Sequence, residues 1–186
     1  LQLRQFGANL YVADLVAISI VRELGPIMTA ILVAGRSGSA FAAEIGTMQV
    51  NEEVDALVTM GFDPMTFLSV PKLLAMLAVT PILTLFADLH GILGGLVVGV
   101  AGLDLTARAY LAETHEALTA PAILASLVKA EVFAVLIATV GCQRGFRVRG
   151  GADAVGAAAT SAVVTSIFLI IIADSAFALV QQYLGI

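Results

Sequence analysis

The sequence has little charge for its length. Only 12% of its 186 residues are charged, whereas 60% are apolar, and its mean hydropathy is +1.01. A soluble domain carries about 25% charged residues, and disordered segments and nucleic-acid-binding domains are more polar still. The net charge of −5 likewise argues against nucleic acid as a partner. The composition therefore predicts an integral membrane protein.

Cysteine and cofactor-binding patterns are also scarce. Cys142 is the one cysteine, so no internal disulfide can form. The sequence contains neither a cluster of cysteine and histidine with metal-ligand spacing nor a G-x-x-x-x-G-K-[ST] phosphate loop. We therefore expect no metal, no cofactor and no ATPase site in this chain, and any ATP must be hydrolysed by a separate subunit.

Four apolar stretches are long enough to cross a bilayer, which requires about 20 residues per helix. Two of them are longer than this and contain Pro26 or Pro81. Proline removes a backbone donor and crowds the carbonyl four residues earlier, so bends are expected there. We predict a single all-α polytopic membrane helix bundle over residues 1–186, with spans at about 13–45, 68–102, 122–140 and 156–180.

Basic residues in the short loops predict the orientation of the bundle. Loop 141–152 holds Arg144, Arg147 and Arg149 and is expected to be cytoplasmic. Loop 46–67 is then also cytoplasmic, and loop 103–121 lies on the outer side. We interpret the chain, which begins with Leu1, as N-terminally incomplete, with five spans in the full-length protein. Three tyrosines are expected near the outer membrane surface: Tyr11, Tyr110 and Tyr183.

Loop 46–67 departs from the positive-inside pattern because it has four acidic residues and no lysine or arginine. Asn51 is a plausible N-cap, and apolar residues follow at helical spacing until Gly61. The pattern predicts a short amphipathic helix over residues 51–60, either a solvated connector or a helix that docks on a cytoplasmic partner. Its candidate docking residues are Glu52, Glu53, Asp55, Leu57, Met60 and Asp63.

Small residues recur at four-residue spacing, which allows close contact between membrane helices. Three such ladders are present: Gly35, Ser39 and Ala43; Gly38, Ala42 and Gly46; and Gly91, Gly95 and Gly99. The spacing alone does not separate packing within one chain from the seam of a homodimer.

Several ionisable residues fall inside the predicted spans, where each is costly unless it is paired or faces water. At 1.5 Å per residue they lie roughly 10 to 17 Å from the outer ends of their spans. Pro26 adds polarity at this depth because the carbonyl that it displaces belongs to Arg22. The layer is either a salt-bridge network or the polar mouth of a substrate pathway. Its members are Arg22, Glu23, Asp88, Lys129, Glu131 and Asp174.

Three functions are each suggested by some of these residues. Residues 35–38 match the G-x-S-G pattern of rhomboid-type proteases, but Ser37 and the candidate base His90 are predicted at different depths. An ion-coupled secondary transporter would titrate Glu23, Glu131 or Asp174, although no inverted repeat is visible. A purely structural membrane subunit is the third alternative.

Four segments together resemble the MlaE-type permease family of ABC lipid transporters. They are Arg22–Pro26 (RELGP), Ala34–Ala40 (AGRSGSA), Ala43–Met48 (AEIGTM) and Glu53–Pro64 (EVDALVTMGFDP). The resemblance continues through Pro71, Pro81, Lys129 and Asp174 and covers nearly the whole chain. Lys72 departs from it, because the family usually has arginine there, and the family's upstream interfacial helix and first span are not in this sequence.

The resemblance implies a multi-pass subunit of the cell inner membrane that forms a homodimer and performs no covalent chemistry. It implies a cytoplasmic ABC ATPase subunit and an MCE-domain lipid-binding protein as partners, and phospholipids or related membrane lipids as cargo. The helix over residues 52–60 would be the coupling helix that enters the ATPase. The lipid pathway would be lined by Phe6, Arg22, Glu23, Leu24 and Ile27.

Overall fold

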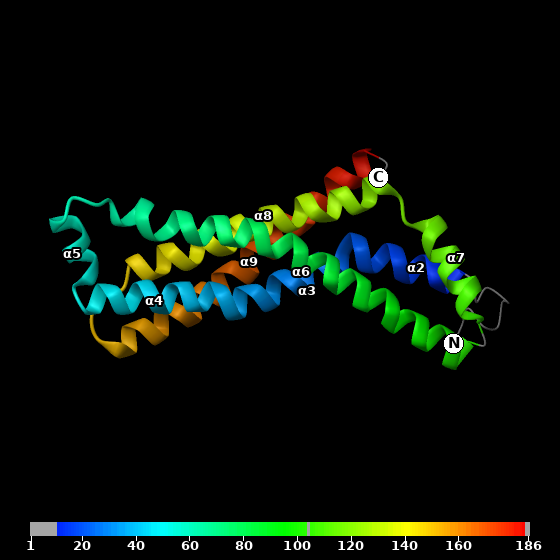
Figure 1. The fold of residues 1–186 in the computed structure, drawn as a ribbon, viewed down its shortest axis with the longest axis horizontal. Coiled ribbons are helices and arrows are strands. Elements are labelled where there is room, and N and C mark those ends of the chain that lie inside the picture. Colours follow the sequence, from blue (N-terminus) through cyan, green and yellow to red (C-terminus); the bar gives the residue numbers. More distant parts are fainter. Residues whose placement is uncertain (1–10, 104, 185–186) are drawn as a thin grey trace.

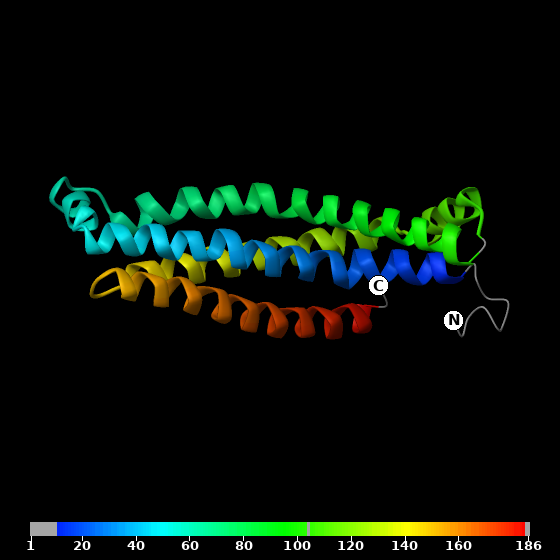
Figure 2. The ribbon, with the colours of Figure 1, turned by 90° about the horizontal axis from the view of Figure 1, so that it is seen from below.

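The computed structural model describes residues 11–103 and 105–184, and within these ranges every regular element is a helix. Four helices are long and apolar enough to cross a membrane: Tyr11–Val50, Pro64–Leu103, Ala120–Phe146 and Ala152–Tyr183. Figure 1 and Figure 2 show them running alongside one another as an elongated bundle. The predicted all-α membrane bundle is confirmed. Phe6 lies outside the described residues.

The first span is one long helix that twice changes its hydrogen-bonding pattern. Its parts are α2 (Tyr11–Ser19), the π-helical η1 (Ile20–Leu24), α3 (Gly25–Val33), the π-helical η2 (Ala34–Gly38) and α4 (Ser39–Val50). Pro26 is at the start of α3, directly after η1. The disturbance expected at this proline therefore takes the form of a π-helical turn just before it.

The second span, α6 (Pro64–Leu103), continues through Pro71 and Pro81. At 1.5 Å per residue its 40 residues extend about 60 Å, twice the thickness of a bilayer core of about 30 Å. Figure 1 shows that α6 changes direction along its length, and Pro81 lies near its middle. The helix therefore both bends and projects beyond the bilayer core.

The core forms where α4 packs against α8 (Ala120–Phe146) and α9 (Ala152–Leu184). Glycines bring the first span and α8 together, because a Cβ atom at Gly141 would lie 2.7 Å from the carbonyl oxygen of Gly38 in η2, and one at Gly145 would lie 2.7 Å from the Cβ of Ile45 in α4. A Cβ at Gly46 would lie 2.8 Å from a methyl of Val148, just after α8. The ladder that begins at Gly38 therefore serves packing within the chain, whereas a Cβ at Gly35 would meet nothing within 4 Å.

An amphipathic helix, α7 (Ala107–Ala117), lies in the segment that we predicted as the outer loop. Thr106 caps it by accepting a hydrogen bond from the Ala109 N–H at 3.2 Å. Tyr110 is fully buried against Gly95 and Gly99 of α6. The ring is buried because the two glycines leave room for it, and the prediction that Tyr110 lies near the outer membrane surface stays a prediction.

The short helix between the first two spans is α5 (Glu53–Thr59), and it lies at the end of the bundle opposite α7 (Figure 1). The prediction that Asn51 caps it was wrong. Asn51 instead ends α4, and the N-cap of α5 is Glu52, whose left-handed φ of 60° turns the chain between the two helices. After α5, Gly61 has a φ of +83°, which glycine adopts without strain.

The close contact of α4 with α8 predicts opposite effects of alanine at two glycines. Gly141→Ala should lower the free energy of unfolding by about 1 to 3 kcal/mol, because backbone rather than a flexible side chain stands in its way. Gly35→Ala should leave it unchanged or raise it by up to about 1 kcal/mol through helix propensity. Unfolding by titration with SDS in mild detergent measures both, and equal effects would contradict this packing.

Candidate functional site

A fully buried lysine joins three helices within the membrane-spanning part of the bundle. Lys129 of α8 is 0% exposed. Its Nζ lies 2.9 Å from Glu23 Oε2 of η1 and 2.9 Å from Asp174 Oδ1 of α9. It also donates a hydrogen bond of 2.9 Å to the Arg22 carbonyl. The contact with Asp174 is an ion pair without hydrogen-bond alignment. We call Glu23, Lys129 and Asp174 the charged centre.

The Arg22 carbonyl is available to Lys129 because of the local sequence. It stands four residues before Pro26, and proline has no N–H to complete the α-helical hydrogen bond. An ammonium has three protons to donate. Lys129 therefore supplies the donor that proline lacks, and the same contact holds η1 against α8.

The charged centre carries a formal net charge of −1 when all three groups are ionised. The side chain of Asp174 is 17% exposed and that of Glu23 is 37% exposed. Glu23 also lines a groove of about 540 Å³ between the first span and α9. On another wall of this groove, Arg22 donates a hydrogen bond of 3.5 Å to Gln181 Oε1. A polar, open groove thus adjoins the buried lysine.

Two other members of the predicted polar layer are not bonded to the charged centre. Asp88 of α6 is 5% exposed and lies against Gly25, where a Cβ atom would overlap its carboxylate. Glu131 is half-buried on α8. Within residues 11–103 and 105–184, one carboxylate oxygen of each is buried without a hydrogen-bond partner. Of the two apolar candidates, Leu24 is 53% exposed and Ile27 packs against the core.

The acidic loop places its candidate residues on different surfaces. Glu52, Glu53 and Asp55 are exposed, and Met60 is 62% exposed, whereas Leu57 is half-buried. Val58, which was not among the candidate docking residues, is 57% exposed. Helical periodicity did not separate these two neighbours, because the contacts with α4 and α6 decide which of them is covered.

Asp63 caps the first turn of α6 rather than extending α5. It accepts hydrogen bonds from the backbone N–H of Thr66 at 3.1 Å and of Met65 at 3.3 Å, and another from the Thr66 hydroxyl. These donors stabilise the ionised carboxylate, first among them the Thr66 hydroxyl, and so hold the pKa of Asp63 below its ordinary value.

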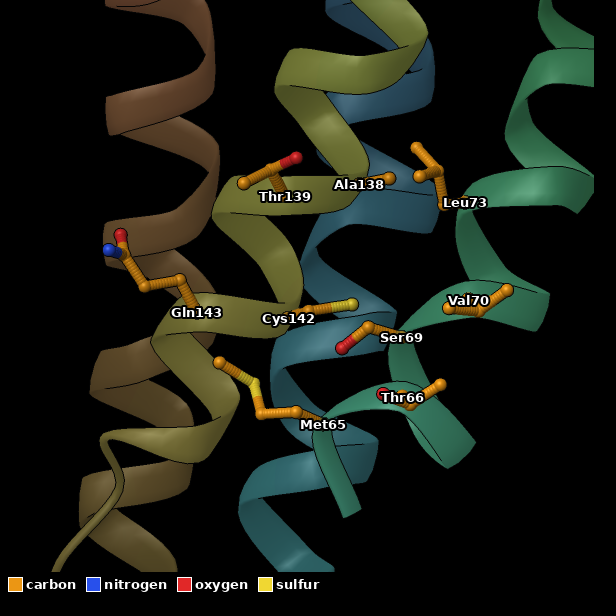
Figure 3. A pocket seen from close by; sticks show the side chains of 9 residues that line it. All are labelled: Met65, Thr66, Ser69, Val70, Leu73, Ala138, Thr139, Cys142 and Gln143. Atoms are coloured by element: carbon orange, nitrogen blue, oxygen red, sulfur yellow. The ribbon is translucent and has the colours of Figure 1, made fainter. Parts of the chain in front are cut away.

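A second cavity, of about 370 Å³, lies between α6 and α8 near the end that bears α5 (Figure 3). Its lining is mostly apolar, and the Cys142 thiol points across it toward Ser69. None of the members of the charged centre lines it. This cavity is therefore separate from the groove beside Glu23.

The structure separates the two residues of the protease hypothesis. His90 follows Asp88, which lies at the level of Gly25, whereas Ser37 is twelve residues further along the first span, about 18 Å at 1.5 Å per residue. The His90 Nδ1 atom lies 2.7 Å from the Phe86 carbonyl of its own helix. A nucleophile and its base must be within hydrogen-bond reach, and these two are not.

Four helices long and apolar enough to cross a membrane, with a charged centre between three of them and a short exposed helix at one end, are typical of a multi-pass membrane protein. The sequence model described as Permease MlaE matches residues 1–180, and the chain belongs to the MlaE permease family. The resemblance seen in the sequence is thereby confirmed.

Named relatives agree with this membership. The chain is 43% identical over 170 residues to a probable ABC transporter permease protein of Rickettsia felis, covering 91% of this chain and 66% of the relative. A probable ABC transporter permease protein of Synechocystis is 40% identical over 169 residues, 91% of this chain and 64% of the relative. Protein TRIGALACTOSYLDIACYLGLYCEROL 1, chloroplastic, of Arabidopsis thaliana is 38% identical over 170 residues, 91% and 49% of the two chains. The chain thus spans about two thirds of the bacterial relatives and half of the plant one.

Removing the buried cation of Lys129 should lower the free energy of unfolding far more than removing the cation of Lys72, whose partner Glu44 is exposed. Lys129→Met leaves two carboxylates without their counter-charge and should lower the free energy of unfolding by about 3 kcal/mol or more. Lys72→Met breaks an ion pair of 2.8 Å with Glu44, in which the two side chains are 14% and 57% exposed, and should lower the free energy of unfolding by about 1 kcal/mol. Unfolding in detergent compares the two.

The same measurement separates charge from packing. In a Lys129→Met background, neutralising both carboxylates with Glu23→Gln and Asp174→Asn should restore part of the lost stability, because no unpaired charge remains buried. A triple variant less stable than Lys129→Met alone would refute the electrostatic explanation.

The cap at Asp63 predicts a pH dependence at the start of α6. Because the folded-state pKa is lowered, the cap stabilises the helix above the ordinary Asp pKa, and this is lost as pH falls through the folded value. Thr66→Val should raise the pKa of Asp63, as followed by NMR of its carboxyl carbon. Thr59→Val is the control, since its hydroxyl bonds the Ala56 carbonyl, and an equal shift there would contradict the assignment.

Proposed function

We propose that this permease moves phospholipids or related lipids between membranes, driven by a separate cytoplasmic ATPase subunit. The observation that carries the proposal is the charged centre beside an open groove, in a chain of the MlaE permease family. The name of the Arabidopsis relative, which refers to a diacylglycerol lipid, supports a lipid as cargo.

The groove suits an amphipathic cargo. Arg22, Glu23 and Gln181 offer polar contacts for a head group, and Ile18 and Ala178 of the same groove offer apolar contacts for acyl chains. The exposed Leu24 lines a neighbouring groove and would extend the apolar surface, whereas Ile27 packs against the core. Phe6 is the proposed aromatic at the rim. The other half of the cavity would come from a second copy of the permease, and an MCE-domain protein would exchange lipid at the outer side.

The short helix α5 is the proposed contact with the ATPase. It combines exposed acidic residues with the exposed apolar side chains of Val58 and Met60, and it joins the first span to α6. Closure of the ATPase pair would push the two α5 helices together. The movement would reach Glu23 along the first span, which is continuous from Tyr11 to Val50, and would squeeze or open the cavity. In the cell we place the protein in the inner membrane.

Two substitutions should separate cargo handling from coupling. Glu23→Gln removes a charge beside the groove and should lower lipid transfer between reconstituted vesicles by about tenfold without weakening ATPase docking. Val58→Asp places a charge on an exposed apolar position and should abolish docking while leaving the permease folded. Leu111→Asp is its control, since Leu111 is 50% exposed on α7 at the opposite end.

The reconstituted, full-length complex decides between this proposal and its rival. Normal transfer by both Glu23→Gln and Val58→Asp would show that the roles are wrongly assigned. Lipid or solute transport that persists without the ATPase subunit but collapses with the proton gradient would establish an ion-coupled carrier instead.

A further inference from the structure

An arginine on the first span lies far from the charged centre and has no described counter-charge. Arg36 belongs to η2, and its side chain is exposed. Among residues 11–103 and 105–184, no acidic side chain lies within ion-pair distance of it. An unpaired charge on a membrane-spanning helix is costly unless it reaches water or a lipid phosphate.

The depth of Arg36 places it near the membrane surface on the side of α5. It is thirteen residues beyond Glu23, or about 20 Å along the helix axis. Its neighbour Gly38 packs against Gly141, five residues before α8 ends at Phe146. The guanidinium is therefore within reach of the head groups of the leaflet on the side of α5, which the loop arginines predict to be cytoplasmic.

Arg36 stands at one end of a groove of about 400 Å³ between the first span and α6. Ser37 lies beside it, and Leu32, Val33 and Leu83 continue the lining. Thr29 is the one polar residue toward the other end, and it is 5% exposed. The groove ends near Ala87. The next residue, Asp88, lies against Gly25, which directly follows η1 of the charged centre. The polar end of the groove thus faces the surface on the side of α5 and its apolar end faces the middle of the membrane.

A lipid molecule in that leaflet is polar and apolar in the same order, with its head group at the surface and its acyl chains toward the middle of the membrane. A phosphate at Arg36 would receive a charge-assisted, bidentate hydrogen bond. The acyl chain would then lie against Leu32 and Leu83, which are 70% and 40% exposed. Neither Glu23 nor Lys129 lines this groove.

We propose that Arg36 and the groove between the first span and α6 bind a phospholipid of the leaflet on the side of α5, with its phosphate on the guanidinium. This site is separate from the groove beside Glu23, and the inference does not rest on the proposed transport function.

Photocross-linking in nanodiscs tests the proposal on the full-length permease. The probes are phosphatidylglycerol with a diazirine in its acyl chain and the diacylglycerol with the same chains. We expect the phosphatidylglycerol to label residues 80–87 of α6 about tenfold more than the diacylglycerol does. Equal labelling by the two probes would overturn the proposal.

Variants identify the contacts. Arg36→Gln should remove the preference for phosphatidylglycerol. Arg36→Lys should keep part of it, because lysine retains the positive charge but lacks the paired N–H donors of the guanidinium. Arg149→Gln is the matched control, because Arg149 is exposed in the loop after α8 on the same side. Leu83→Trp, which leaves Arg36 intact, should block labelling by both probes. Unchanged labelling in Arg36→Gln would refute the site.

A protein occupant is the competing possibility. In a Cys142→Ala background, Leu83→Cys should react with a lipid-soluble maleimide in the full-length permease if the groove opens to lipid. Failure to react would mean that another protein segment or a second copy covers the groove, and the proposal would then be wrong. Glu23→Gln should leave the labelling unchanged, so failure of this site is distinguishable from failure of the transport proposal.

Discussion

The need to find acceptors for one buried ammonium constrains the middle of this bundle. Lys129 has no exposed surface, so its charge is tolerable only because Glu23, Asp174 and the Arg22 carbonyl surround it at 2.9 Å. These acceptors come from the first span and α9, and Lys129 itself comes from α8. Three of the four spans are therefore fixed relative to one another at this depth. Such a contact defines one alignment of the helices more strictly than apolar packing does, because sliding any of them by a turn strands a charge.

The charged centre is open on one side, where Glu23 lines the groove. One carboxylate, Asp174, is largely enclosed, while Glu23 reaches the groove that also holds Arg22 and Gln181. The surplus negative charge is thus next to an opening and not sealed in the core, where it would be most costly. The groove therefore presents both signs of charge, from Arg22 and Glu23. The buried lysine holds Glu23 in position without lining the groove itself.

The sequence predicted the four apolar helices and the short helix after the first span. These follow from hydropathy, periodicity and the rise per residue. It did not predict which carboxylates meet Lys129, because depth does not fix the direction in which a side chain points. It also did not predict α7, although Thr106 followed by a polar stretch is a capping signal, or the burial of Tyr110. Those outcomes depend on Gly95 and Gly99 of a distant helix, which no local pattern identifies.

The two π-helical turns carry a consequence for the angular phase of the first span. Each adds one residue to a turn, and one residue corresponds to a rotation of about 100°. The helix between η1 and η2, α3, is therefore rotated by about 100° relative to a regular continuation of α2, and α4 is rotated by about another 100°. Deleting one residue of η1 after Arg22 would rotate Arg22 and the residues before it about the helix axis. It would shorten the span by only about 1.5 Å. Migration of such a turn along the chain would rotate the residues that it passes by about 100° relative to both ends of the span, while most backbone hydrogen bonds persist.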